Sequence, residues 1–205
     1  MWSVWRVWRQ KRKLFQKSDS YRGFLFFASP SSPRPNPDIY LSLRNRMTSL
    51  MTNDKALKDD DYMTPKEVWE SIKTYIPQNK VIWEAFYGDG KSGEYLRELG
   101  FNVIHEPIDF FKENRGDVIV SNPPFSLKMK VLQRLKELDK PFILLLPAST
   151  LGTKTLQELY GNDIQLIIPK GRISYNKNGK PTNGVWFASF FYCYKCNLQR
   201  DIIFL

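Results

Sequence analysis

The segment "DVIVSNPPFSLKMKVLQRLKELDKPFILLLP" (117–147) shows the pattern of a strand, a helix and a second strand. It begins with a short apolar run at 117–121 and ends with a longer one at 141–147. Continuous apolar runs of this length are typical of strands that are buried on both faces of a parallel sheet. Residues 127–139 are predicted to form the helix between them. A strand, a helix and a further strand make the repeating unit of doubly wound α/β sheets.

The same alternation extends in both directions along the chain. Strands are predicted at 80–86, 101–106, 164–170 and 185–194, and helices at 63–76, 93–100 and 155–161. In the first of these helices, Thr64 is the expected N-cap, Pro65 the first helical residue, and Glu67 the partner that completes a capping box. A doubly wound α/β fold binds its ligands beyond the carboxyl ends of its strands. The turns that follow 80–86 and 117–121 are therefore expected to lie side by side.

Charge and composition divide the chain into two parts. Residues 1–60 contain 12 Lys or Arg and 5 Asp or Glu, whereas residues 61–205 contain 19 and 16. We expect 1–60 to be a basic, poorly ordered extension and 61–205 to be the folded domain. Because the net charge is +10, a polyanion is the favoured partner.

The basic, tryptophan-rich segment 1–17 leaves several interpretations open: an organelle-targeting peptide, a membrane-surface helix, a nucleic-acid arm, or an extension with no defined role. No apolar run reaches the roughly 18–20 residues that span a bilayer. Two cysteines, Cys193 and Cys196, favour a reducing intracellular compartment, either nucleus or cytoplasm. With one histidine in the chain, we expect no metal site.

The segment "EAFYGDGKSG" (84–93) places three glycines between a strand and a helix. Small residues there allow a ligand to approach the backbone, and the helix start offers N–H groups. The spacing of a phosphate-binding P-loop is absent. Glu84 at the strand end would repel a pyrophosphate but suits a positively charged group such as the ammonium of an amino acid.

Further acidic residues follow the next strand. Glu106 ends that strand, where a carboxylate accepts hydrogen bonds from ribose hydroxyls. In "IDFF" (108–111), Asp109 is expected to accept from an adenine amino group and Phe110 to cover the ring. Taken singly, each acid is also explained as a solvated loop charge. Together they describe a ligand with ammonium, ribose and adenine, which is S-adenosylmethionine.

The corner "SNPPFS" (121–126) suits an acceptor with an amino group on a flat ring. The lone pair of such an amino group is delocalised, and two hydrogen-bond acceptors on its N–H bonds release it. Asn122 offers a side-chain carbonyl, Pro123 a backbone carbonyl, and Pro124 stiffens the turn. Phe125 is expected to stack on the extruded base. The chemistry then requires orientation more than acid–base groups.

These motifs resemble the amino-methyltransferase superfamily, in its N-6-adenine branch. "SNPPF" resembles the catalytic motif, "EAFYGDG" the cofactor motif, "MTPKEV" the preceding T-P motif and "IDFF" the adenine-holding element. Over 62–205 the chain is most similar to small adenine methyltransferases of phages, large DNA viruses and mobile elements. The resemblance implies that Thr64 and Pro65 close over the methionine carboxylate. It also implies that Phe86, Gly88 and Gly90 contact the cofactor.

The resemblance also implies a Rossmann-like class I methyltransferase fold, mostly parallel with a terminal antiparallel strand. The short interval between Glu106 and Asp117 indicates a reduced version that lacks one strand and one helix. The implied activity is S-adenosylmethionine-dependent methylation of adenine in DNA. The alternatives are an RNA adenine methyltransferase, a protein glutamine methyltransferase and a non-catalytic subunit.

Target recognition has no separate domain in this sequence. Base readout is expected from the loop 171–184, the basic arm or a partner protein. Four basic residues in or beside the loop are candidates for phosphate contacts, with a solvated basic hairpin as the alternative: Lys170, Arg172, Lys177 and Lys180.

Overall fold

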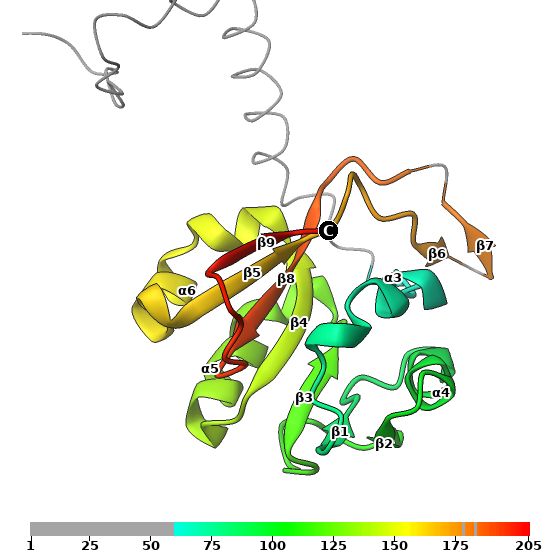
Figure 1. The fold of residues 1–205 in the computed structure, drawn as a ribbon, viewed down its shortest axis with the longest axis horizontal. Coiled ribbons are helices and arrows are strands. Elements are labelled where there is room, and N and C mark those ends of the chain that lie inside the picture. Colours follow the sequence, from blue (N-terminus) through cyan, green and yellow to red (C-terminus); the bar gives the residue numbers. More distant parts are fainter. Residues whose placement is uncertain (1–59, 178, 183) are drawn as a thin grey trace, which may run out of the picture. The chain divides into compact units, whose positions relative to one another are not determined.

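The core of the molecule is a seven-stranded, mostly parallel sheet. Figure 1 shows the computed structural model, which describes residues 60–177, 179–182 and 184–205. The strand order is β2-β1-β3-β4-β8-β5-β9, and β8 runs antiparallel to both of its neighbours. The strands are β1 (Val81–Trp83), β2 (Asn102–Ile104), β3 (Val118–Ser121), β4 (Phe142–Pro147), β5 (Ile164–Ile168), β8 (Ser189–Tyr194) and β9 (Ile202–Phe204). The predicted Rossmann-like α/β class is confirmed. The predicted extension lies outside the described residues except for Asp60.

Helices cover both faces of this sheet. They are α3 (Lys66–Ser71), α4 (Lys91–Glu98), α5 (Lys128–Leu138) and α6 (Lys154–Leu159). In Figure 1, α5 and α6 lie on one side of the strands, and α3 and α4 on the other. Strand β4 shows why both faces are apolar: Ile143 and Leu145 belong to the core cluster with α3 and α4, whereas Leu144 and Leu146 belong to the cluster with α5 and α6.

The connection from β2 to β3 confirms the predicted reduction of the fold. Residues 105–117, all of which the structure describes, contain neither helix nor strand. The chain passes from β2 back to β3 on the far side of β1 through turns alone. Strand β2 therefore forms one edge of the described sheet.

The antiparallel strand differs from the prediction in two ways. It begins at Ser189 instead of residue 185, because Ser189 pairs with Pro147, the last residue of β4, and the preceding residues lie beyond that strand. It is also not the last strand, since β9 follows it and pairs in parallel with β5 at the sheet edge.

The first helix is shorter than predicted, and Thr64 is not its N-cap. Helix α3 begins at Lys66 with Pro65 as the capping residue, and a separate 3-10 turn covers Lys73–Tyr75. The reason is a β-bridge between Met63 and Asn176, whose backbone N–H and C=O groups exchange hydrogen bonds of 2.9 Å in both directions. This bridge keeps the chain extended up to the helix start.

The segment 171–184 forms a small hairpin. Its strands are β6 (Asn176–Lys177) and β7 (Lys180–Pro181), which appear in orange beyond α3 in Figure 1. Further 3-10 turns cover Phe125–Leu127, Ala148–Gly152 and Gly161–Asp163. Within the described part of the chain, no helix has the length and apolar character that crossing a membrane requires.

Candidate active site

A cavity of about 300 Å³ opens where β1, β2 and β3 end. It is lined by the turns after these strands and by residues that precede α3. The lining residues are Asp60, Tyr62, Met63, Thr64, Ala85, Phe86, Tyr87, Gly88, Asp89, Ser92, Ile108, Asp109, Phe110, Phe111, Asn122 and Pro124. The expected juxtaposition of the glycine loop with the Asn-Pro-Pro corner is confirmed.

The glycine loop takes its shape from two left-handed residues. Gly88 has φ +54° and Gly90 has φ +85°, a region in which a side chain is strained. Gly90 donates its N–H to the Tyr87 carbonyl at 2.9 Å and is the N-cap residue of α4. A Cβ on Gly88 would lie 3.0 Å from the Met63 sulfur, so Met63 packs directly over this loop. Gly88 lines the cavity, whereas Gly90 does not.

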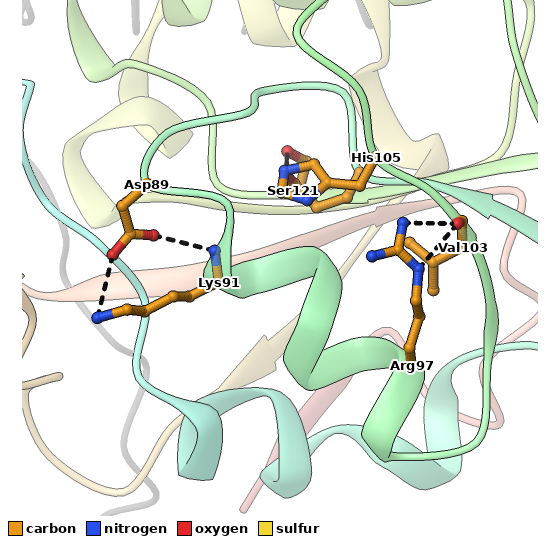
Figure 2. A network of polar contacts seen from close by, with 7 residues as sticks. Asp89, Lys91, Arg97, Val103, His105 and Ser121 are labelled. Carbon is orange, nitrogen blue, oxygen red and sulfur yellow. Dashed lines mark hydrogen bonds and ion pairs between the residues drawn. The ribbon is translucent and has the colours of Figure 1, made fainter.

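Beneath the loop lies a buried polar group built from Glu84, His105 and Ser121. His105 Nε2 lies 2.6 Å from Glu84 Oε2, and Ser121 Oγ donates a hydrogen bond to Glu84 Oε1. Figure 2 shows His105 beside Ser121 at the strand ends, while Asp89 accepts from the backbone N–H of Lys91 at the start of α4. Glu84 is 1% exposed and is absent from the cavity lining. Its predicted contact with an ammonium group stays a prediction.

The pKa values of this pair follow from burial and proximity. Loss of solvent raises the pKa of Glu84, although bonds from His105 and Ser121 oppose that change. Burial alone would lower the pKa of His105, but the hydrogen bond and the charge of Glu84 outweigh it and raise that pKa. The pair therefore holds a proton more tightly than its separated members do.

The predicted adenine-side residues are divided between the cavity and the surface. Asp109 and Phe110 line the cavity. Asp109 Oδ1 accepts the backbone N–H of Phe111 at 2.9 Å, and Phe110 packs against Phe86 with ring centroids 5.0 Å apart. Glu106 is exposed and lies outside the lining. Asp109 therefore lies at the cavity, whereas Glu106 does not, and the ribose and adenine contacts assigned to them stay predictions.

The corner presents one unused acceptor. Asn122 Nδ2 donates to the Tyr62 carbonyl at 2.8 Å, which fixes the orientation of the amide. Asn122 Oδ1 is buried and has no hydrogen-bond partner among the described residues. A buried acceptor without a hydrogen bond destabilises the folded state unless a ligand donates one to it. Pro124 lines the cavity, whereas Pro123 and Phe125 are buried outside its lining.

A second unused polar atom comes from the T-P motif. Thr64 Oγ1 is buried, lines the same cavity, and has no partner in the described part of the chain. Pro65 is buried outside the lining. Two residues of one cavity lining thus each carry a buried polar atom without a described partner, which indicates a polar ligand.

The residues just before the T-P motif are the ones that sequence reasoning missed. Asp60 accepts hydrogen bonds from the backbone N–H and the Oγ of Ser126, the former at 3.0 Å. Asp60, Tyr62 and Met63 all line the cavity. No sequence pattern marked them, because Asp60 and Tyr62 contact the corner across 66 and 60 positions of chain, and Met63 pairs with the distant Asn176. Tyr87 and Asp89 also line the cavity, although the glycine pattern assigns them no role.

The charge of the lining is negative. Three described lining residues are aspartates (Asp60, Asp89 and Asp109), and none of the others is Lys or Arg. Lys91 and Lys112 lie 3.7 Å and 3.5 Å from Asp89 and Asp109 and partly offset their charge. The lining residues themselves include no cation that could hold a polyphosphate.

The four predicted phosphate-contacting residues lie away from the cavity lining. Lys170, Arg172 and Lys180 are exposed, and Arg172 donates to the Val185 carbonyl at 3.3 Å. The Lys177 ammonium lies 5.6 Å from the centroid of the Tyr62 ring. Lys177 therefore lies beside Tyr62, whose carbonyl accepts the Asn122 amide.

No protein-family model matches the sequence, and no curated protein matches it. Among solved structures, the chain is similar to a precorrin-6y C5,15-methyltransferase from Geobacter metallireducens GS-15, with 12% sequence identity and a TM-score of 0.37. The match covers 67% of this chain and 95% of the other. A likeness at this level carries no argument about activity, which must come from the site itself.

Proposed function

We propose that the protein is an S-adenosylmethionine-dependent methyltransferase that acts on the exocyclic amino group of adenine in DNA. The observation that carries the proposal is Asn122 Oδ1, a buried acceptor without a described partner in the same cavity as the glycine loop. An amino group that must be held while it is methylated supplies the missing donor.

The cavity fits the cofactor by size, polarity and charge. Its volume of about 300 Å³ is at the lower end of small-molecule sites, which run from about 300 to 1,000 Å³. The negative lining suits a molecule with a sulfonium and an ammonium group. Thr64, Gly88, Asp109 and Phe110 are the residues we assign to hold it. When bound, the cofactor supplies a methyl group on a positively charged sulfur.

The chain's own residues have to orient the acceptor. Asn122 Oδ1 accepts one N–H of the amino group, and the carbonyl of Pro123 is the second proposed acceptor. With both N–H bonds engaged, the nitrogen lone pair turns out of conjugation toward the methyl group. Placement of this kind would accelerate the displacement, in which the N–C bond forms as the C–S bond breaks, sulfur keeps the electron pair as a neutral thioether, and the methylated nitrogen then releases one proton to solvent.

The basic surface favours a nucleic acid over a protein glutamine as the acceptor. Net charge is positive both in the extension and in residues 61–205. Exposed Lys170, Arg172 and Lys180 provide phosphate contacts. RNA adenine and protein glutamine are the competing acceptors, and a chain without catalysis is the remaining alternative.

The test is a labelled methyl-transfer assay on the full chain. The protein is incubated with methyl-labelled S-adenosylmethionine and, separately, duplex DNA, single-stranded DNA, RNA and a glutamine peptide. Nucleoside mass spectrometry then identifies the product. We expect N6-methyladenine in DNA; label found only in RNA or in the peptide would contradict the substrate.

Replacement of Asn122 tests the role of its carbonyl. Asn122→Ala should lower the transfer rate by about 100-fold or more while the cofactor dissociation constant, measured by calorimetry, changes little. Asn79→Ala removes an exposed asparagine and is the matched control. Equal rates for Asn122→Ala and wild type would exclude the proposed role of Asn122.

A further inference from the structure

Four aromatic rings meet at the corner. The rings of Tyr62 and Phe125 are nearly parallel, with centroids 6.0 Å apart and planes 23° from one another. Tyr175 and Phe187 meet the Tyr62 ring at 62° and 85°, with centroids 5.6 Å and 5.5 Å away. The Tyr62 ring is thus nearly parallel to Phe125 but offset from it, and it makes edge contacts with Tyr175 and Phe187.

Three of these rings belong to the rigid core and one does not. Phe125, Tyr175 and Phe187 are each no more than 2% exposed. Tyr175 is also fixed by a 2.8 Å hydrogen bond from its hydroxyl to Ser189 Oγ. Tyr62 is half-buried and belongs to the short segment that precedes α3. Three buried rings consequently form a slot, and Tyr62 fills it.

The slot lies next to the residue that we propose holds the acceptor. Asn122 Nδ2 donates to the carbonyl of Tyr62 itself, so the slot adjoins the amide whose Oδ1 is unused. A flat acceptor ring held by Asn122 and stacked on Phe125 requires the space where the Tyr62 ring lies. The two rings exclude one another.

Tyr62 is held in place by contacts at the rim. Asp60 bonds to Ser126 at an exposed position, and the carbonyl of Tyr62 accepts the partly buried Asn122 amide. One aromatic stack replaces another when an incoming ring takes the slot, so the apolar contacts of Phe125 are kept.

We propose that Phe125, Tyr175 and Phe187 form the acceptor-ring slot and that Tyr62 occupies it until the acceptor ring displaces it. The inference rests on the proposed function for the identity of the ring, a nucleobase. Tyr62 then acts as a competitor of the acceptor ring for this slot. Only molecules in which Tyr62 has left the slot can bind the acceptor ring. The apparent affinity for the ring is therefore lowered in proportion to the fraction of such molecules.

The experiment measures binding of a fluorescent base directly. The probe is a single-stranded oligonucleotide that contains 2-aminopurine, titrated into the full chain with S-adenosylmethionine present. Tyr62→Ala should bind this probe at least about fivefold more tightly than wild type, because the competing ring is gone. Tyr62→Phe, which keeps the ring, should restore the wild-type affinity. Tyr62→Leu tests the same point with a bulkier apolar side chain if the alanine variant folds poorly.

Tyr75→Ala is the matched control. Tyr75 is also half-buried and packs against the same core cluster, but it lies in the 3-10 turn after α3 and away from the corner. Its loss should leave the probe affinity unchanged. Unchanged or weaker probe binding by both Tyr62→Ala and Tyr62→Leu would overturn the slot and show that Tyr62 is structural.

Calorimetry with S-adenosylmethionine alone separates the two proposals. If the wild-type chain does not bind S-adenosylmethionine, the proposed function is wrong. Tighter probe binding by Tyr62→Ala would still support the slot in that case. Normal cofactor binding together with no gain in probe affinity would overturn the slot alone.

Discussion

Gly93 sits where α4 passes closest to the buried polar group. A Cβ at this position would lie 2.1 Å from His105 Nδ1 and 2.5 Å from His105 Cβ. His105 cannot withdraw easily, because Glu84 contacts its other ring nitrogen at 2.6 Å. We expect Gly93→Ala to lower the free energy of unfolding in urea by about 1–3 kcal/mol through overpacking.

Gly152 provides the control for that experiment. An added Cβ there meets no atom within 4 Å among the described residues, and its backbone is not left-handed. Gly152→Ala should change the free energy of unfolding by less than about 0.5 kcal/mol. Equal losses in the two variants would show that His105 does not limit the space at Gly93.

His105 should make stability depend on pH. Its folded-state pKa is raised above that of the unfolded chain, so its stabilising contribution is complete below about 6.5 and is lost as pH rises through the folded pKa. The free energy of unfolding should therefore fall as pH rises above about 6.5, by at most about 1.4 kcal/mol per pH unit. His105 is the one histidine of the sequence, so His105→Gln should flatten the profile. A slope that persists in this variant would assign the effect to another group.

The sequence predicted which residue types lie at the strand ends, but it did not predict which side chains they contact. It placed an acid at the end of β1 and an amide after β3, because both follow apolar runs. It did not indicate that Glu84 contacts His105 and Ser121. These two residues come from the ends of β2 and β3, the strands on either side of β1. Such contacts depend on which strands pair, and a single strand does not encode that choice.

Strand β9 alternates between solvent and core. Ile202 and Phe204 are 50% and 75% exposed, while Ile203 between them packs against the core cluster. The double variant Ile202→Lys, Phe204→Lys should change the free energy of unfolding by no more than about 0.5 kcal/mol per substitution and reduce aggregation at this sheet edge. Ile203→Lys should cost roughly 2 kcal/mol or more.

Urea denaturation of these variants, with light scattering for aggregation, tests the register of β9. A one-residue shift in pairing would exchange the inward and outward side chains. If Ile203→Lys were tolerated and the double variant were not, the pairing of β9 with β5 would be wrong.

Elements with long apolar runs were predicted well, and short or tertiary-determined ones were not. The run at 141–147 became β4, and 127–139 became α5 within one residue at each end. Strand β9 was missed although β1 and β2 are equally short, because no helix precedes it and its pairing with β5 is a tertiary contact. Thr64 was assigned as a helix cap from local sequence alone, whereas the bridge from Met63 to Asn176 moves the helix start to Lys66.

For the whole molecule, the site depends on segments distant in sequence. The cavity requires the turns after β1, β2 and β3 together with residues 60–64, and the aromatic slot adds Tyr175 and Phe187. The alternation of strands and helices predicted the first three of these contributions. It gave no information on where the chain before α3 or the hairpin 171–184 would lie, because neither has a periodic pattern.

The two core clusters cover opposite faces of the sheet, and β4 contributes residues to both, so stability should be greatest at this strand. All six residues of β4 are buried, and β4 pairs with β3 on one side and with β8 on the other. Amide hydrogens of β4 and β8 should therefore exchange with solvent most slowly, through opening of the whole domain. Those of β9 and the β6–β7 hairpin, which lie at an edge or outside the main sheet, should exchange at least about tenfold faster through local opening. Exchange of β4 amides as fast as those of β9 would mean that the sheet opens from its centre, and that the site is held by its loops instead of by the core beneath it.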